Sequence, residues 1–282
     1  MSLVAKDMAL LNGTALVTGA GSGIGQATAL AYARAGCQNI VLADRDESSI
    51  GNTAQMIGKQ WPSVKTLGVV TDVSDQTSVD NMVKKTVEVF GTLDYAANVA
   101  GVTCQARSLS ADYPVSEFDR VNSINARGLM FCVQAETRVM REQALRVTIE
   151  GYQERRAQRG SIVNIASTCG LSAIANIMPY VVSKHAVVGV TRAFAVDHGK
   201  DGIRINAVCP GIVETPMLLQ RKAMEQASEA RTGAVKDIKD PVIGRLAVAD
   251  EIADICVFLS SSMASYMHGS MVMADGGKMA EY

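Results

Sequence analysis

The sequence lacks features that would place it with membrane, secreted or nucleic-acid-binding proteins. No apolar run reaches the ~18 residues that a membrane-spanning helix needs. The first residues lack a basic segment followed by an apolar one, so we expect no secretory signal. Charge is balanced, with 27 Lys and Arg against 28 Asp and Glu, which offers no strong positive field to a duplex or an anionic membrane. We therefore predict that neither nucleic acid nor a membrane is a partner.

Paired cysteines are also missing. The six cysteines lie far apart and form no C-x-x-C pair; they are Cys37, Cys104, Cys132, Cys169, Cys209 and Cys256. That spacing fits neither a zinc site nor a disulfide framework. We expect no metal site, and we expect mostly buried, reduced thiols of a cytoplasmic protein.

Apolar patterning predicts the fold class. At 282 residues and 48% apolar composition, the chain can bury a large core. Short apolar runs typical of strands alternate with longer segments of helical period, the pattern of a parallel sheet covered by helices on both faces. The expected strands are 14–18, 39–43, 64–70, 93–99, 161–166, 203–208 and 270–274, and the expected helices lie near 24–35, 47–60, 76–90, 116–142, 179–199 and 249–260. With no linker or internal repeat, we predict one doubly wound α/β Rossmann-type domain over residues 1–282, with a seven-stranded parallel sheet.

Two stretches interrupt this alternation. Residues 143–160 lengthen the connection into the fifth strand, and we interpret their basic cluster of Arg155, Arg156 and Arg159 as a solvated loop. Residues 212–243 follow the sixth strand with apolar side chains and then a polar tract. A long connection at the carboxyl end of a strand borders the crevice where such sheets bind ligands. We therefore predict that 212–243 is a substrate-covering flap.

The first expected strand runs into a glycine-rich turn with the sequence TGAGSGIG at 18–25, directly before a helix. Glycines allow a tight turn and a close approach to a pyrophosphate, and the helix N-terminus presents free N–H groups to the anion. Alone, this signal is weak, because an ordinary tight turn has the same composition. The second strand, however, ends in Asp44, where a carboxylate that binds the adenosine ribose is expected. Together these features predict a dinucleotide site.

Asp44 also bears on the choice of cofactor. A 2′-phosphate about 5 Å from this carboxylate would be repelled by roughly 3 kcal/mol per unit charge at an effective dielectric constant of 20. The sequence therefore predicts NAD in preference to NADP. Two alternatives stay open: Arg45 pairing with a phosphate, and Asp44 as an ordinary turn residue at the end of a strand.

Tyr180 and Lys184 stand four residues apart in an expected helix, so they share one helical face. A phenol with a pKa near 10 is a poor base at neutral pH, and lowering that pKa by about three units requires ~4 kcal/mol. A cation ~4 Å away supplies about that energy at an effective dielectric constant of 20. Tyr-x-x-x-Lys alone is common, and an exposed helical pair is its alternative. Here Ser167, a hydroxyl at the end of the fifth expected strand, accompanies it.

With these residues in place, the chain resembles the short-chain dehydrogenase/reductase family from Thr14 to Gly277. The motifs that carry the resemblance are TGAGSGIG at 18–25, Asp72-Val73, Asn98-Val99-Ala100-Gly101, Asn125 within SINARG, Ser167, Tyr180-x-x-x-Lys184, Pro210-Gly211 with Thr215, and Asp275-Gly276-Gly277. Val99 departs from the pattern, because the family usually has a second asparagine there. The departure concerns hydrogen bonding in the central strand more than the chemistry.

The resemblance implies a role for each matching residue. Tyr180 would be the general acid or base, and Ser167 would hydrogen-bond the substrate oxygen. Lys184 would hold the nicotinamide ribose and lower the pKa of Tyr180, while Asn125 would support a water relay to Lys184. Thr168 is an alternative hydroxyl to Ser167. The implied cofactor-binding residues are Gly19, Ser22, Gly23, Ile24, Gly25, Asp44, Asp72, Val73, Asn98, Ala100, Gly101, Tyr180, Lys184, Pro210, Gly211, Val213 and Thr215.

The predicted function is hydride transfer between NAD(H) and a secondary alcohol or ketone. The expected substrate-side residues are largely apolar, which favours a hydrophobic small molecule; they are Val102, Thr103, Cys104, Cys169, Gly170, Leu171, Asn176, Ile177, Met217, Leu218 and Leu219. Arg107 and Arg127 are candidates for a substrate carboxylate. A non-redox isomerase, dehydratase or cyclase, or an NAD(H)-binding module, is the alternative. The family usually forms dimers or tetramers through the helices near 116–142 and 179–199, so we expect a homo-oligomer.

Overall fold

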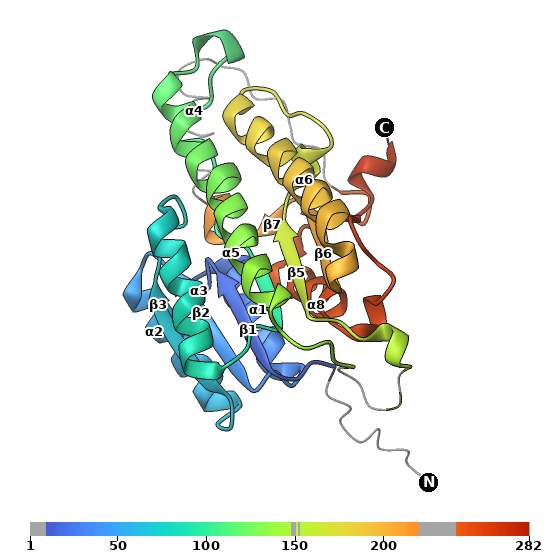
Figure 1. Cartoon of the computed structure of the whole chain (residues 1–282). Coiled ribbons are helices and arrows are strands. Elements are labelled where there is room, and N and C mark those ends of the chain that lie inside the picture. Colours follow the sequence, from blue (N-terminus) through green and yellow to red (C-terminus); the bar gives the residue numbers. More distant parts are fainter. Residues whose placement is uncertain (1–9, 148–150, 152, 220–240, 282) are drawn as a thin grey trace.

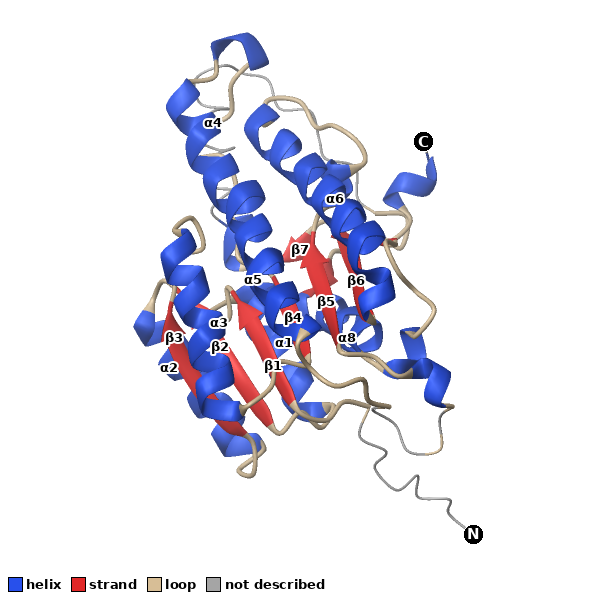
Figure 2. Ribbon diagram, viewed as in Figure 1, coloured by secondary structure: helices blue, strands red, loops and turns tan. Residues whose placement is uncertain are grey.

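Seven parallel strands form one sheet between two layers of helices in the computed structural model of the chain (Figures 1 and 2). The structure describes residues 10–147, 151, 153–219 and 241–281. In sheet order the strands are β3 (Lys65–Val70), β2 (Asn39–Asp44), β1 (Thr14–Thr18), β4 (Tyr95–Asn98), β5 (Gly160–Ile165), β6 (Ile203–Pro210) and β9 (Met271–Ala274). The predicted doubly wound parallel sheet is confirmed. Strand order reverses between β1 and β4, which is the switch point where such sheets bind ligands.

Helices cover both faces of this sheet (Figure 1). The main helices are α1 (Gly23–Arg34), α2 (Glu47–Gln60), α3 (Gln76–Phe90), α4 (Val115–Asn122), α5 (Leu129–Arg141), α6 (Met178–His198) and α8 (Ala249–Ser260). Helices α3, α5 and α6 pack on one face, and α1, α2 and α8 pack on the other. Within the described residues, no helix is both long enough and apolar enough to cross a bilayer.

The central strands are buried on both faces, which explains their continuous apolar sequences. Successive residues of β1 show how a strand serves both layers. Leu16 packs in the cluster beneath α3 and α5, whereas Ala15 and Val17 pack in the cluster beneath α1. The six cysteines are free and buried, as the sequence predicted.

The expected helix near 116–142 is not regular. Between α4 and α5 lies a π-helix, Ser123–Gly128, so the prediction of one uniform helix was wrong in this respect. A π segment accommodates one extra residue per turn and often occurs at functional sites. Its last residue, Gly128, packs against the chain after β3, where a Cβ would lie 2.7 Å from the carbonyl oxygen of Val73.

The stretch after β6 contains elements that the sequence did not predict. A short strand, β7 (Val213–Glu214), pairs in parallel with β8 (Ala247–Val248). Most of the predicted flap, residues 220–240, lies outside the described residues.

The basic cluster in 143–160 also differs from the prediction. Arg156 and Arg159 are half-buried, and both bind other parts of the chain. Arg156 donates to the hydroxyl of Ser265, and Arg159 donates to the carbonyl oxygen of Asp201 at 2.7 Å. The interpretation as a solvated loop holds only for the exposed Arg155. Arginines that anchor loops to backbone carbonyls have the same sequence pattern as solvated ones.

Candidate active site

The glycine-rich turn connects β1 to α1 at the switch point. A Cβ at Gly25 would lie 1.9 Å from the carbonyl oxygen of Gly19, and a Cβ at Gly19 would lie 2.9 Å from the backbone of Ala100. Gly19 also has a φ of +69°, which favours glycine. These contacts pack the first turn of α1 against the glycine turn, and the glycine turn against the chain after β4, without a side chain between them.

The N-terminus of α1 is suited to an anion. Ser22 is its N-cap residue, but the Ser22 side chain makes no capping hydrogen bond. By contrast, Asp46 caps α2 by accepting from the N–H of Ser48, and Asp75 caps α3 by accepting from the N–H of Thr77. The first N–H groups of α1 therefore receive no capping bond from the Ser22 side chain, and they carry the positive end of the helix dipole. A pyrophosphate fits this position.

Two carboxylates stand at or just after the ends of β2 and β3, and the first of them contacts the glycine turn. Asp44 accepts hydrogen bonds from the N–H of Gly21 at 2.9 Å and from the N–H of Asp46 at 3.2 Å. Asp72 is exposed and accepts from the hydroxyl of Ser74 at 2.7 Å. Hydrogen bonds from the Ser74 hydroxyl and N–H hold the pKa of Asp72 below its ordinary value. The hydrogen bond from Gly21 thus fixes Asp44 next to the glycine turn.

The end of β4 links the two halves of the site. The hydroxyl of Thr18 accepts hydrogen bonds from the N–H groups of Val99, at 3.1 Å, and Ala100, at 3.3 Å. Asn98 points into the interior, where its side-chain amide donates to Glu136 at 2.9 Å and to Asn164 at 3.1 Å. The Asn98 side chain is therefore engaged within the core, and Asn98 does not line the cavity described below.

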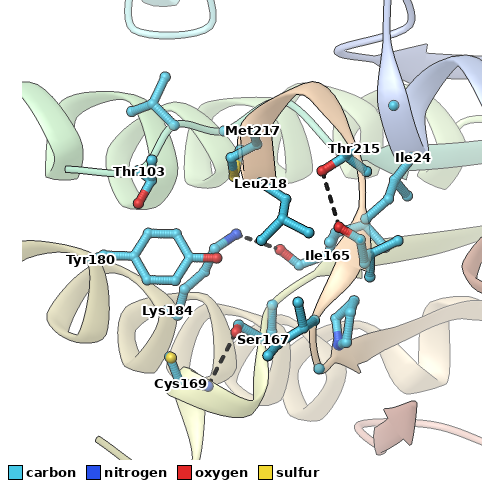
Figure 3. Close-up of a pocket in the computed structure, with 18 of the residues that line it drawn as sticks. Ile24, Thr103, Ile165, Ser167, Cys169, Tyr180, Lys184, Thr215, Met217 and Leu218 are labelled. Carbon is cyan, nitrogen blue, oxygen red and sulfur yellow. Dashed lines mark hydrogen bonds between the residues drawn. The ribbon is translucent and has the colours of Figure 1, made fainter. Parts of the chain in front are cut away.

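Tyr180 and Lys184 lie on the same face of α6 and line one cavity (Figure 3). The Lys184 ammonium is 5.6 Å from the centre of the Tyr180 ring. It donates to the carbonyl oxygen of Ile165 at 2.8 Å. Burial lowers the pKa of Lys184 to about 8, and the buried thiols of Cys169 and Cys209 partly oppose this shift. A buried cation beside a phenol is the arrangement that stabilises a phenolate.

Ser167 lies two residues after the end of β5 and faces the same cavity (Figure 3). Its Oγ accepts a hydrogen bond from the N–H of Cys169 at 3.1 Å. This bond caps a 3-10 helix, Thr168–Gly170, and fixes the direction of the hydroxyl oxygen. Thr168 also lines the cavity, so the structure does not separate the two candidates by position.

Asn125 lies in the π-helix behind Gly101. Its side-chain oxygen accepts from the N–H of Val102 at 2.8 Å, and its amide donates to the Val102 carbonyl at 2.8 Å and to the Ser183 hydroxyl at 3.0 Å. These bonds fix the loop after β4 against α6. A Cβ at Gly101 would lie 3.2 Å from the Asn125 oxygen and 3.8 Å from the Lys184 nitrogen.

The cavity collects much of the predicted site. The predicted catalytic and cofactor-binding residues that line it are Gly19, Ser22, Gly23, Ile24, Gly25, Gly101, Ser167, Tyr180, Lys184, Pro210, Gly211, Val213 and Thr215. Those outside its lining are Asp44, Asp72, Val73, Asn98, Ala100 and Asn125. Asp44 and Asp72 continue the site along β2 and β3, while Asn98 and Asn125 lie behind the wall and support it.

The substrate side of the cavity is mainly apolar, as expected. The predicted residues that line it are Val102, Thr103, Cys104, Cys169, Ile177, Met217 and Leu218, whereas Gly170, Leu171, Asn176 and Leu219 do not. Arg107 lines the cavity and Arg127 does not; Arg127 stacks on Phe131 instead. Sequence reasoning missed Ile174, Pro216 and Lys278. Lys278 directly follows the Asp-Gly-Gly signature, a position that could have identified it.

Comparison with known proteins decides the family. Residues 19–278 match the family described as enoyl-(acyl carrier protein) reductase. The short-chain dehydrogenase fogB of Aspergillus ruber is 37% identical over 270 residues, covering 95% of this chain and 97% of that protein. The chain belongs to the short-chain dehydrogenase/reductase family. Levodione reductase of Leifsonia aquatica is 35% identical over 267 residues, covering 95% of this chain and 94% of that protein.

Solved structures agree with this assignment. The crystal structure of levodione reductase superposes with a TM-score of 0.85 at 34% identity, covering 96% of this chain and 98% of that one. A putative 2-deoxy-D-gluconate 3-dehydrogenase from Agrobacterium tumefaciens, with bound NADP, has a TM-score of 0.76 at 28% identity, covering 98% and 99% of the two chains. The chain is therefore an oxidoreductase that binds a nicotinamide nucleotide and transfers a hydride to or from a small alcohol or ketone.

Proposed function

We propose that this short-chain dehydrogenase/reductase uses NAD(H) to interconvert a hydrophobic secondary alcohol and its ketone, with Tyr180 as the general acid and base. The observation that carries the proposal is a single cavity lined by Tyr180, Lys184 and Ser167 on one side and by the glycine turn on the other. Bound nicotinamide would supply the hydride or accept it. The chain's own residues supply the proton and hold the reacting oxygen.

Each catalytic side chain has a distinct task in this proposal. The phenol of Tyr180 gives its proton to the carbonyl oxygen during reduction and takes it back during oxidation. The Ser167 hydroxyl, whose oxygen already accepts from the Cys169 N–H, donates to the same substrate oxygen. Lys184 holds the nicotinamide ribose, and its charge favours the Tyr180 phenolate. Asn125 fixes the adjoining loop and supports a water relay to Lys184.

The preference for NAD(H) rests on Asp44. Its carboxylate is tied to the N–H groups of Gly21 and Asp46, so it cannot easily turn away from a 2′-phosphate. One related structure holds NADP, so cofactor choice differs within the fold. Asp44 favours NAD in this chain, because an approaching 2′-phosphate would meet a fixed negative charge.

A panel of alcohols and ketones tests the proposed function. NADH absorbance would be followed with purified protein, NAD and a series of aryl and polycyclic secondary alcohols, and with NADH and the matching ketones. Turnover with at least one pair supports the proposal. Binding of NADH without turnover of any pair would favour the NAD(H)-binding module, and conversion of substrate without net change in NADH would favour the non-redox enzyme.

We also propose a homo-oligomer, a dimer or tetramer, in the cytoplasm. Apolar side chains form a stripe on α6: Val182 and Ala193 are exposed, Ala186 is half-buried, and Val190 is half-buried and packs against the core. Packing within one subunit accounts for Val190 but leaves Val182 and Ala193 exposed, which suits an interface between subunits. Six buried, free thiols suit a reducing compartment.

A further inference from the structure

A buried polar network lies beneath the candidate active site, where α5 and α6 pack on β4 and β5 (Figure 1). The Asn98 amide of β4 donates to Glu136 of α5 at 2.9 Å and to Asn164 of β5 at 3.1 Å. Asn164 donates to the hydroxyl of Thr191 of α6 at 3.0 Å. All four side chains are at most 2% exposed. The network therefore joins two strands to two helices inside the core.

Glu136 is the one carboxyl group of this network. It is fully buried, and no charged side chain of the described α3, β4, β5, β6 or α6 contributes to its pKa. Its titratable neighbour is Cys132, one turn earlier on α5, whose thiol pKa is raised by burial and then by Glu136. Burial raises the pKa of Glu136 to about 7, and the hydrogen bond from Asn98 opposes that shift. An ionised Glu136 would be a buried charge without a counter-ion, which is costly.

The unsatisfied atoms of the network indicate where a proton belongs. Among the described residues, Glu136 Oε1 and Asn98 Oδ1 have no hydrogen-bond partner, although both are buried. Both are acceptors while Glu136 is ionised. A proton on Glu136 removes the buried charge and turns one of these two acceptors into a donor. The neutral carboxyl is therefore the form that suits this environment.

Asn98 connects the network to the candidate cofactor site. The next residues of the chain, Val99 and Ala100, donate their N–H groups to Thr18, and the Ala100 backbone touches Gly19 of the glycine turn. Gly101 then lines the cavity. A shift of Asn98 would thus move both the turn that faces the pyrophosphate and the wall that faces the nicotinamide.

The same network reaches the catalytic face of α6. Thr191 and Lys184 stand two turns apart on the buried side of this helix. Thr191 binds Asn164 of β5, and Lys184 binds the carbonyl oxygen of the next residue, Ile165. These two bonds hold α6 against β5. Loss of order at Glu136 would therefore displace residues on both sides of the site, the glycine turn and the catalytic face of α6.

We propose that Glu136 is a positioning residue that holds Asn98, and with it residues 98–101, in the cofactor-binding geometry only while its carboxyl carries a proton. The proposal rests on the cofactor site described above. Ionisation of Glu136 leaves a buried, unpaired carboxylate. The energetic cost of this charge falls when α5 and the end of β4 separate and water reaches the carboxylate. Cofactor affinity should consequently fall as pH rises through the pKa of Glu136.

The test compares NADH binding by the wild type and Glu136→Gln, followed by NADH fluorescence between pH 6 and pH 8. If binding requires the protonated carboxyl and its pKa is about 7, the wild-type Kd rises about tenfold over this range relative to the variant. Gln keeps the neutral shape and has no proton to lose, so at pH 8 Glu136→Gln should bind NADH about tenfold more tightly than the wild type does at the same pH. Lys184 also titrates near pH 8, but it is common to both proteins.

Glu142→Gln is the matched control, because Glu142 is an exposed carboxylate just after α5. It should keep the wild-type pH profile. Parallel wild-type and Glu136→Gln profiles would overturn the proposal. Carbon NMR of the wild type with labelled glutamate carboxyls adds a readout that needs no variant. One glutamate should titrate near pH 7, and its absence would equally overturn the proposal. Neither measurement uses a ketone, so both are independent of the redox assignment.

Discussion

At the scale of single residues, Lys184 shows a conflict between function and stability. Its ammonium is buried, and burial lowers its pKa to about 8. Below that pH the folded protein carries a desolvated cation that the unfolded chain would expose to water. Its ammonium donates to a neutral carbonyl oxygen, that of Ile165. The charge that we propose serves Tyr180 and the cofactor therefore destabilises the protein without ligands.

Lys184→Met should stabilise the ligand-free protein near pH 7 while abolishing turnover. Removing the buried cation should raise the free energy of unfolding by up to about 3 kcal/mol. Loss of the hydrogen bond to Ile165 should lower it by about 1 kcal/mol. The folded-state pKa is lowered, so between pH 8 and the ordinary lysine pKa the unfolded state binds the extra proton. Wild-type stability therefore rises with pH in that window, and the advantage of the variant shrinks.

Urea unfolding of both proteins at about pH 7 and pH 10 measures this effect. Lys59→Met, at an exposed lysine at the end of α2, is the control and should change stability little. A Lys184→Met protein that is less stable than wild type at both pH values would contradict the account of Lys184 as a costly buried cation.

Asp44→Ala should narrow the preference for NAD over NADP by about tenfold to a hundredfold, since ~1.4–3 kcal/mol of phosphate repulsion is removed. Calorimetric titration with both nucleotides measures the ratio of their Kd values. Asp80→Ala removes an exposed carboxylate of α3 and should leave the ratio unchanged. Tighter binding of NADP than NAD by the wild type would refute the proposed preference outright.

At the scale of elements, the π-helix between α4 and α5 positions the catalytic support. It turns Asn125 toward the Val102 backbone and brings Gly128 against Val73. Gly128 has no room for a side chain, because a Cβ would lie 2.7 Å from a backbone oxygen. Displacement of this segment would move Asn125 and the loop that it holds.

Gly128→Ala should lower both the melting temperature and kcat/KM, although alanine favours helix by about 1 kcal/mol. Gly58 is the matched control, because it lies within α2 and a Cβ there meets nothing within 4 Å. Gly58→Ala should raise the melting temperature without affecting turnover. Calorimetry and initial rates on the two variants check this. If both variants gained stability equally, the close packing of Gly128 would not be a constraint.

The sheet was predictable because each strand and helix has its own periodicity in the sequence. Strands such as β5 and β6 are buried on both faces and give continuous apolar runs. The π-helix was not predictable, because it continues the helical chain from α4 into α5 and the close contact of Gly128 with Val73 exists only in the folded chain. The short pair β7 and β8 has too few residues for any pattern.

The site shows the same division. Motif residues that line the cavity, such as Tyr180 and Lys184, could be named because their spacing is fixed by one helix. The orientation of the Asn98 side chain into the core could not be predicted, because it depends on a hydrogen bond to Glu136. Nothing in the sequence connects Glu136 to β4. Local motifs therefore identify the groups that face a ligand, whereas the network that supports them emerges only in three dimensions.

At the scale of the whole molecule, the proposed assembly depends on α6. Val182→Arg places a charge on its outward stripe and should shift the protein toward monomers, since a charge at the centre of an apolar interface is poorly solvated. Light scattering at micromolar concentration measures the mass. Val89→Arg, at an exposed position of α3, is the control. A wild-type mass of one subunit, 29.9 kDa, would rule out the proposed oligomer.

The sheet brings together two halves of the site that are distant in the sequence. The glycine turn follows β1, and the catalytic helix α6 follows β5, yet both line one cavity. In our account, bringing the glycine turn and α6 together holds the Tyr180 phenol beside the place where the hydride is transferred. The central claim is therefore proton transfer by that single oxygen.

The most direct test is the rate of NADH formation by Tyr180→Phe at saturating NAD and alcohol. The account predicts a loss of at least about 10²-fold to 10⁴-fold, as for removal of a general acid or base, with NAD affinity nearly unchanged because the ring remains. Tyr266→Phe, at a fully exposed tyrosine, should retain wild-type turnover. A Tyr180→Phe enzyme within a few-fold of the wild-type rate would mean that another group moves the proton, and would contradict the account.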